Sequence, residues 1–416
     1  MLIRAALLDA PERGRLRFVA DGALLLEGAR ILEAGKAEDL LPRHAGVEVH
    51  DLRPLWVLPG LVDLHTHLPQ LEAVAQDGLI LLDWLETHIF PTEARFGDGG
   101  HARMVARAFF KGCLREGTTT VVAYGSSHAE AAEVAFQEAE AAGLRTVLGP
   151  ALMDRNAPAA LLRPADRALA DLQALAGAWH GRHGRLEVAV APRFAPSCSP
   201  TLMRGAAALA NRLGAVLETH LAETHAEIAW VEDLFPEAPH YTGLYEAMGL
   251  LGPRSLLGHG IHLAPEEREL IRAAGATVVH CPRSNAFLQS GIMPLRRWLE
   301  EGLTVGLGTD VAAGPSLSLF EEMAFACQAA KLRGEPVDVA TALHLATVGG
   351  AKALGWEARL GTLDEGKEAD LILVDPALAD PLSRDTSDPR TVLSHLLYRA
   401  RPGLVRGAFV QGRRCL

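Results

Sequence analysis

The chain is poor in cysteine and in aromatic residues, and each shortage excludes a class of protein. Its 416 residues include 5 cysteines, which are scattered and never spaced as CxxC. Neither a disulfide framework nor a cysteine zinc knuckle is therefore indicated. Aromatic residues make up 5% of the chain, and the formal net charge of −11 comes without any basic block. Because nucleic-acid binding depends on basic patches and stacking rings, we expect no nucleic-acid partner.

Long apolar runs are also missing. No stretch of the sequence approaches the roughly 18 apolar residues of a membrane-spanning helix. The opening MLIRAALLDAPERG is interrupted by charged residues too soon for a secretory signal. We expect a soluble cytoplasmic protein that has no membrane partner. With 49% hydrophobic residues, the chain is long enough for a large core and more than one domain.

Lysine is scarce as well, with 5 residues against 35 arginines. None of the lysines lies between Lys111 and Lys331. This long central stretch therefore has no lysine to offer to a metal site.

The order of apolar segments predicts an α/β fold. The two ends of the chain read as short alternating strands, whereas the middle alternates apolar strands with helical stretches. The eight candidate strands of the middle are VLPGLVDLHTH, TTTVVAYG, RTVLGPALM, LEVAVAPRF, AVLETH, SLLGHG, TVVHCP and TVGLGTD. Eight such units predict a (β/α)8 TIM barrel. We expect the barrel at 58–357 and a small β-sandwich domain formed by 1–57 together with 358–416.

Polar side chains stand at the ends of these strands. His65 and His67 end the first strand, and side chains two residues apart on a strand point to the same side. His220, His259 and Asp310 each close a later apolar run. Because catalytic groups of such barrels lie at the carboxyl ends of strands, we expect these side chains to meet.

Three imidazoles and one carboxylate suit zinc or another borderline divalent ion. We predict that one ion per subunit, Zn²⁺ with Fe²⁺ as the alternative, binds to His65, His67, His220 and Asp310. An HxH pair taken alone is more often structural, and the alternative role of Asp310 is a helix N-cap. The agreement of several strand ends favours the metal site.

Glu223 follows His220 by three residues and is the candidate proton carrier. It would move a proton from the attacking water to the leaving group. The alternative is a first-turn acid favoured by the helix dipole, a role that Glu227 fits better. Asp310 would also act as a base toward the water, and His259 is either a ligand or a group that hydrogen-bonds the water.

Three further residues are candidates for substrate binding. Arg193 ends the fourth strand and offers a rigid fork of donors, suited to a carbonyl oxygen and an adjacent ring nitrogen. Phe194 would stack on a flat heterocycle, and Gln70 can both donate and accept. The alternatives are a surface salt bridge for Arg193 and core packing for Phe194.

Several stretches resemble the amidohydrolase superfamily and, within it, the guanine deaminase family. They are PGLVDLHTH, HTHLPQ, LLDWLETHIFPTEARF, APRFAPSCS, THLAET, VHCPRSNAFLQSG, GLGTDVAAG and GTLDEGKEADLILVD. The resemblance implies zinc on the four ligands named above, a homodimer and a role in purine catabolism. It also implies that the purine base is bound by Gln70, Arg193, Phe194, His220 and Glu223. Two-metal relatives use a carbamylated barrel lysine, so the missing central lysine agrees with one metal.

The expected reaction is hydrolysis of guanine to xanthine and ammonia. A related enzyme acting on another amino-substituted heterocycle (8-oxoguanine, a triazine, a pterin) or on a cyclic amide is the alternative. A non-catalytic scaffold that keeps the barrel is a further one, against which the intact ligands and Glu223 argue. The HxE and PCxxC signature of cytidine-deaminase-type enzymes is absent, which excludes that fold.

Overall fold

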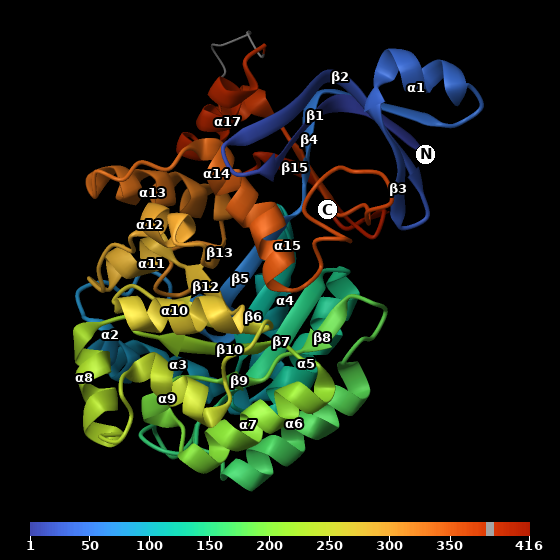
Figure 1. Ribbon diagram of the computed structural model, residues 1–416. Helices are drawn as coiled ribbons and strands as arrows, with labels where there is room; N and C mark the ends of the chain where they lie inside the picture. Colours follow the sequence, from blue (N-terminus) through green and yellow to red (C-terminus); the bar gives the residue numbers. More distant parts are fainter. Residues whose placement is uncertain (380–386) are drawn as a thin grey trace.

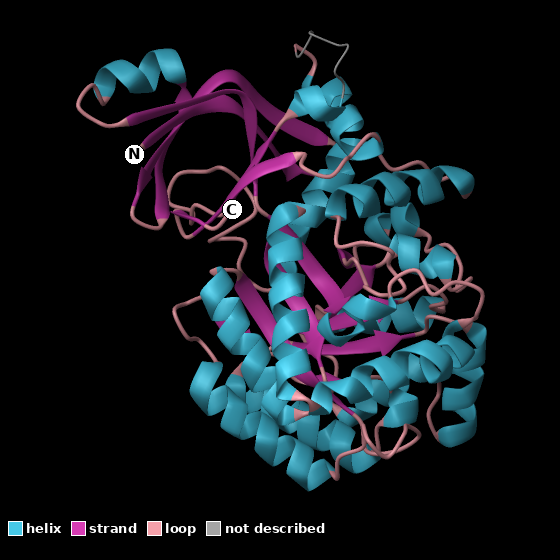
Figure 2. Ribbon diagram, turned by 180° about the vertical axis from the view of Figure 1, so that it is seen from behind, coloured by secondary structure: helices cyan, strands magenta, loops and turns pink. Residues whose placement is uncertain are grey.

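The computed structural model describes residues 1–379 and 387–416, and its central part is a barrel of parallel strands surrounded by helices (Figures 1 and 2). This confirms the predicted (β/α)8 barrel. β8 and β9 are two short pieces that share the fourth position. The strands are β5 (Leu61–His67), β6 (Thr118–Gly125), β7 (Arg145–Leu152), β8 (Leu186–Val188), β9 (Ala191–Pro192), β10 (Leu217–Leu221), β11 (Ser255–His259), β12 (Thr277–His280) and β13 (Thr304–Leu307).

Two seams close the barrel. β5 to β8 form one hydrogen-bonded sheet and β10 to β13 form another. At one seam, Val190 pairs with Leu217 in parallel. At the other seam, the Asp310 N–H donates to the His65 carbonyl at 2.8 Å. The second seam brings the end of the last strand beside the end of the first, so closure itself joins side chains that lie far apart in the sequence.

The outer helices begin and end at local sequence signals. α7 illustrates the local cause: the Ser199 side chain caps its N-terminus, Pro200 is its first residue, and Gly214 ends it at a φ of 61°. The helices of the barrel are α4 (Gly99–Arg115), α5 (Ala129–Ala142), α6 (Ala165–Trp179), α7 (Pro200–Leu213), α8 (His225–Leu234), α9 (Tyr241–Met248), α10 (Pro265–Ala274), α11 (Pro282–Phe287), α12 (Leu295–Glu300) and α13 (Leu319–Leu332).

A chain of short helical turns, residues 68–97, connects β5 to α4. We call it the β5–α4 segment. Pro69 stands at its start, where a residue without an N–H cannot continue the strand. Its elements are η1 (Leu68–Ala73), α2 (Leu81–Trp84), the π-turn η2 (Leu85–Ile89), α3 (Phe90–Ala94) and η3 (Arg95–Gly97). Because it leaves from the carboxyl end of β5, the segment lies over the mouth of the barrel.

Strands from both ends of the chain form a separate seven-stranded sheet in the order β16-β15-β14-β4-β1-β2-β3. The sheet curves around its own apolar core, which includes Ile3, Leu24, Val57 and Leu371, and this curvature produces the predicted sandwich-like domain (Figures 1 and 2). Its strands are β1 (Leu2–Glu12), β2 (Arg15–Glu27), β3 (Arg30–Lys36), β4 (Val49–Pro59), β14 (Leu371–Val374), β15 (Val405–Val410) and β16 (Arg413–Arg414). The remaining helices are α1 (Ala37–Arg43), α14 (Val339–His344), η5 (Leu345–Gly349), α15 (Gly350–Ala353), α16 (Pro376–Ala379) and α17 (Pro389–Tyr398).

The segment VLPGLVDLHTH is two strands rather than the single strand that its apolar pattern predicts. β4 ends at Pro59 and pairs with β14 in the terminal sheet, whereas β5 begins at Leu61 in the barrel. Gly60 makes the transition, because a Cβ there would lie 2.0 Å from Oγ1 of Thr119. The close approach of β6 therefore requires glycine at this position.

A buried arginine connects the barrel to the terminal part of the chain. Arg145, at the start of β7, is 0% exposed. Its guanidinium donates to Asp370 at 2.9 and 3.0 Å and to Glu368 at 2.7 Å. These carboxylates satisfy a charge that would otherwise be buried without a partner.

Replacing Arg145 with alanine should lower the free energy of unfolding by about 3–5 kcal/mol, because two buried carboxylates would lose their cation. Urea denaturation followed by circular dichroism measures the change. The matched control is Arg4→Ala, which removes an exposed pair with Asp21 and should cost at most about 1 kcal/mol. Equal losses in the two variants would contradict a special role for the buried cluster.

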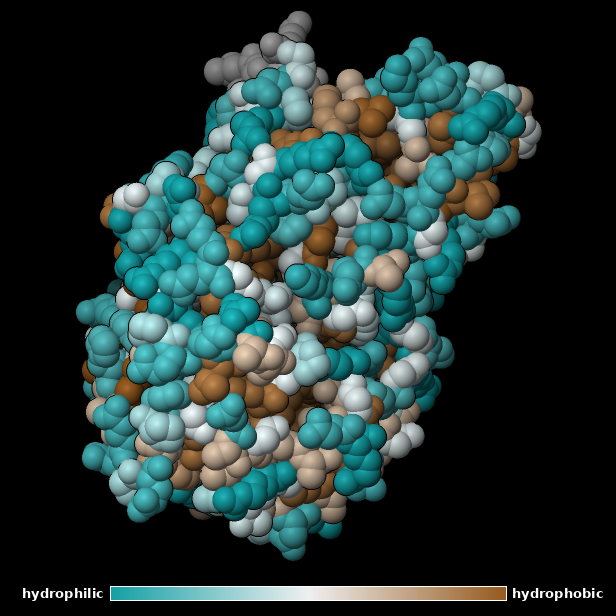
Figure 3. Space-filling view, in the orientation of Figure 1, coloured by the Kyte–Doolittle hydropathy of each residue, from teal (hydrophilic) through white to brown (hydrophobic). Residues whose placement is uncertain are grey.

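The visible surface is mainly hydrophilic. On the face seen in Figure 3, hydrophilic side chains cover most of the molecule and hydrophobic ones appear in scattered patches. Among the described residues, no helix combines the length and the apolar character needed to cross a membrane.

Candidate active site

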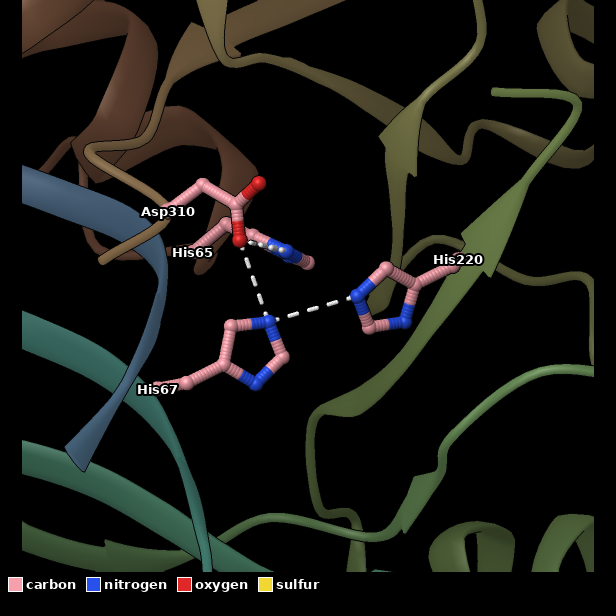
Figure 4. Close-up of side chains that lie close together, drawn as sticks. All are labelled: His65, His67, His220 and Asp310. Carbon is pink, nitrogen blue, oxygen red and sulfur yellow. Dashed lines mark hydrogen bonds and ion pairs between the residues drawn. The ribbon is translucent and has the colours of Figure 1, made fainter. Parts of the chain in front are cut away.

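The four predicted ligands meet at the carboxyl end of the barrel (Figure 4). One ligand atom from each of His65, His67, His220 and Asp310 lies within 4.8 Å of all the others. Oδ1 of Asp310 is 3.3 Å from Nε2 of His65 and 3.1 Å from Nε2 of His67. Nε2 of His220 is 3.3 Å from Nε2 of His67. The nitrogens and the carboxylate oxygen therefore converge on one point.

The state of these groups fits a divalent ion. Nε2 of His65 is buried and has no hydrogen-bond partner among the described residues. Nδ1 of His220 donates to the Arg193 carbonyl at 2.7 Å, which leaves the lone pair of Nε2 for a ligand. Burial lowers the pKa of His67 to about 4 and holds that of His220 well below its usual value, so both imidazoles are neutral. Neutral imidazoles and a carboxylate are ligands that zinc accepts.

Two glycines make room for the first ligand. A Cβ on Gly258 would lie 2.7 Å from Cε1 of His65, and a Cβ on Gly308 would lie 2.7 Å from Cβ of the same histidine. The buried Asp63 then fixes the backbone around the site: it accepts from the N–H of His65 at 3.2 Å and of Thr309 at 3.0 Å. The motifs LLGHG and GLGTD thus supply the side chains of His259 and Asp310 and, through their glycines, the space for His65.

Glu223 lies beside this cluster and is buried. Its Oε1 accepts from the hydroxyl of Ser290 at 2.8 Å, and its Oε2 is 3.3 Å from Nε2 of His259. Burial, and then the charge of Asp310, raise the pKa of Glu223 to about 8. A carboxyl group that titrates near neutral pH is suited to both accepting and donating a proton.

His259 approaches the same point from β11. Its Nδ1 donates to Oδ1 of Asn285 at 2.9 Å, and its Nε2 lies 3.8 Å from Oδ2 of Asp310. Oδ2 of Asp310 also accepts from the hydroxyl of Ser284 at 2.6 Å. His259 is therefore oriented toward both Asp310 and Glu223, where it can hydrogen-bond a water molecule.

Glu227 has the helix-terminal role that its position predicts. It forms a capping box with Thr224 at the start of α8, and its Oε2 accepts from the N–H of Glu223 at 2.8 Å. Its Oε1 accepts from the Tyr241 hydroxyl at 2.9 Å. Asp310 is not the N-cap of the following helix, because Ser318 occupies that position before α13.

A pocket of about 410 Å³ opens onto these groups. Gln70, Arg193 and Phe194 all line it, together with the cluster side chains. Arg193 is buried, so the alternative of a surface salt bridge does not describe it. Phe194 is buried too: it packs in the hydrophobic core and also lines the pocket. The complete lining is His67, Gln70, Leu81, Trp84, Leu85, Arg193, Phe194, His220, Glu223, Glu227, His259, Leu288, Asp310 and Ala313. Its mixed polar and apolar lining suits a small flat molecule.

Several residues of the site escaped sequence reasoning. Glu93 is 2% exposed and binds Arg193, although the two lie 100 residues apart. Trp84 forms a wall of the pocket, and Ser290 and Asn285 orient Glu223 and His259. All four lie in the stretches LLDWLETHIFPTEARF and VHCPRSNAFLQSG, so the resemblance marked the regions without marking the residues.

Comparison with known proteins agrees with this geometry. The profile of the amidohydrolase family matches residues 56–415. The chain belongs to the amidohydrolase family. Within it, the guanine deaminase of Escherichia coli (strain K12) is 36% identical over 401 residues, which cover 94% of this chain and 90% of the relative. The solved structure of E. coli guanine deaminase has a TM-score of 0.96 and 33% identity, covering 99% of this chain and 98% of that chain.

Amidohydrolases of other specificity are similar too. The 5-methylthioadenosine/S-adenosylhomocysteine deaminase of Nitratidesulfovibrio vulgaris (strain DSM 19637 / Miyazaki F) is 36% identical over 422 residues, covering 99% of this chain and 91% of the relative. The amidohydrolase family and the hydrolytic deaminase chemistry are thus common to these relatives.

Proposed function

We propose that the protein is a guanine deaminase that converts guanine and water to xanthine and ammonia. The observation that carries the proposal is that the predicted metal ligands and the predicted base-binding residues line one pocket. The four converging ligand atoms and the carboxyl of Glu223 open onto the cavity that Arg193 lines with hydrogen-bond donors. The similarity to guanine deaminases over most of the chain supports the same substrate.

We propose that one zinc ion per subunit, with Fe²⁺ as the alternative, is held by His65, His67, His220 and Asp310. A divalent ion in such a site lowers the pKa of a water molecule, so that hydroxide is available near neutral pH. Nucleophilic attack falls on the ring carbon that carries the amine.

Glu223 moves the protons of the reaction. It takes one proton from the attacking water and delivers it to the ring nitrogen beside the attacked carbon. It then takes the second proton from the hydroxyl of the tetrahedral adduct and passes it to the amine, so that the C–N bond breaks, ammonia leaves and the carbonyl forms. Asp310 and His259, which lie beside each other, orient the water. Gln70, Arg193 and Phe194 bind the base, with Arg193 at its carbonyl edge and Phe194 against its plane.

The test is ammonia release over a panel of guanine, adenine, cytosine, 8-oxoguanine, melamine and 5′-methylthioadenosine, with metal content measured on the same sample. We expect guanine to give the highest kcat/KM and the protein to contain about one divalent ion per subunit. A higher value for another ring, or metal-free active protein, would overturn the proposal.

A second candidate is deamination of a methylthioadenosine-type substrate, which the N. vulgaris relative favours. Against it, Leu81, Trp84 and Leu85 of the β5–α4 segment line the pocket with apolar surface and offer no polar group for a ribose.

The proposals of a homodimer and of a role in purine catabolism rest on the resemblance alone. Light scattering would measure the oligomeric state.

Ser290→Ala should shift the pH dependence of the reaction. The Ser290 hydroxyl donates to Glu223 and favours its ionised form, so its loss raises the pKa of Glu223. The acidic limb of the kcat/KM profile for guanine should then move to higher pH by about one unit. Steady-state kinetics across pH 5–10 measures the shift. An unchanged acidic limb would contradict a link between Ser290 and Glu223.

A further inference from the structure

A buried carboxylate joins the two polar residues proposed to bind the base. Glu93, in α3 of the β5–α4 segment, is 2% exposed. Its Oε1 and Oε2 accept from Nη1 of Arg193 at 3.0 and 2.7 Å, and its Oε1 also accepts from Nε2 of Gln70 at 2.9 Å. Glu93 thus links the guanidinium and the amide but is not among the residues that line the pocket.

These contacts fix the direction of the Gln70 amide. An ionised carboxylate only accepts, so the NH2 group must face Glu93. On the other side, the N–H of Ala312 donates to Oε1 of Gln70 at 3.2 Å, and a backbone N–H only donates. Glu93 and the N–H of Ala312 therefore favour the same orientation of the amide. Rotating the amide by half a turn would place its oxygen against the Glu93 carboxylate and its NH2 group against the N–H of Ala312.

The groups that Arg193 and Gln70 leave for a ligand are mainly donors, and one lone pair of Oε1 of Gln70 is the exception. Within residues 1–379 and 387–416, neither Nε nor Nη2 of Arg193 has a hydrogen-bond partner, and one N–H of Gln70 is also unused. Arg193 and Gln70 both line the pocket. An edge that presents two acceptors, such as O6 and N7 of guanine, complements these donors. An adenine edge places its N6 amino group, a donor, where the carbonyl would lie.

We propose that Glu93 is a positioning residue that selects purines with a carbonyl edge over those with an amino or unsubstituted edge. This inference rests on the proposed function and names the determinant of its specificity. Glu93 holds Arg193 and Gln70 with their free N–H groups toward the acceptors of the base. A ring without the carbonyl leaves buried donors unpaired, and the loss of those hydrogen bonds is the source of discrimination.

The test compares Glu93→Gln with the wild type on guanine and 2-aminopurine, which carries the same amine but lacks the carbonyl. The wild type should prefer guanine by at least about 100-fold in kcat/KM. In Glu93→Gln, the kcat/KM for guanine should fall by at least about 10-fold, mainly through KM, while that for 2-aminopurine changes less than about 3-fold. Metal content should stay the same.

The matched control is Glu86→Gln, which removes an exposed carboxylate of the same segment and should change neither substrate. Equal losses for guanine and 2-aminopurine in Glu93→Gln would reduce Glu93 to a structural residue and overturn the inference. An unchanged preference of Glu93→Gln for guanine over 2-aminopurine would also overturn the inference.

A binding measurement keeps this inference separate from the proposed function. Hypoxanthine has the carbonyl and purine does not, and neither carries the amine that is hydrolysed. By calorimetry, the wild type should bind hypoxanthine at least about 10-fold more tightly than purine, and Glu93→Gln should bind both equally. If the wild type keeps this preference but releases no ammonia from guanine, the proposed function fails and the inference stands. If it deaminates guanine without the preference, the inference fails alone.

Discussion

Glu223→Gln should lower kcat for guanine by about 10²- to 10⁴-fold while the metal content stays that of the wild type. Glutamine keeps the shape of the side chain and still accepts from the Ser290 hydroxyl, so the pocket should not change. An amide neither accepts nor releases a proton near neutral pH, however, so the ring nitrogen and the amine would lose their proton donor. Ammonia release and metal analysis on one preparation measure both effects.

The control for this variant is Glu232→Gln, which changes an exposed acid on α8 and should leave kcat unchanged. KM for guanine should also change little in Glu223→Gln, because Arg193 and Gln70 make the main polar contacts with the base. A Glu223→Gln enzyme with near-normal kcat would remove Glu223 from proton transfer, and His259, whose Nε2 lies 3.3 Å away, would become the candidate.

The placement of the predicted metal ligands followed from the sequence because parallel strands impose a common direction. His65, His67 and His220 each stand at or near the end of an apolar run, and the carboxyl ends of barrel strands meet at one rim. Asp310 follows β13 by three residues, and the closing seam brings it to His65. A periodic pattern and one topological rule were sufficient for this part of the site.

Contacts between segments that are distant in the sequence could not be predicted from local patterns. The sequence around Glu93 gives no sign that this residue is buried, and its partner Arg193 is 100 residues away. The strand break at Gly60 was also missed, because the apolar pattern continues across it. Only the packing of Thr119 against that backbone makes glycine necessary. Both features depend on side chains of other strands, which local sequence patterns do not contain.

His220→Ala should remove both the metal and the activity. Its ring is held in orientation by the Arg193 carbonyl and supplies one of the four converging ligand atoms, so its loss leaves an incomplete set. Loss of a partner that merely orients a ligand costs about 10- to 100-fold in metal affinity, and loss of the ligand itself should cost more. We expect less than a tenth of the wild-type metal content and no measurable ammonia release from guanine.

Thermal unfolding distinguishes this outcome from simple misfolding. An ion that binds only the folded chain stabilises it in proportion to the logarithm of its concentration over Kd, so a chelator should lower the Tm of the wild type. The Tm of His220→Ala should not respond to the chelator, because there is little bound metal to remove. The control is His225→Ala, which changes an exposed histidine five residues further on and should keep metal, activity and the chelator response. A His220→Ala protein that retains one ion per subunit would place the metal on other residues, and the convergence of nitrogens at His65 and His67 would then need a different explanation.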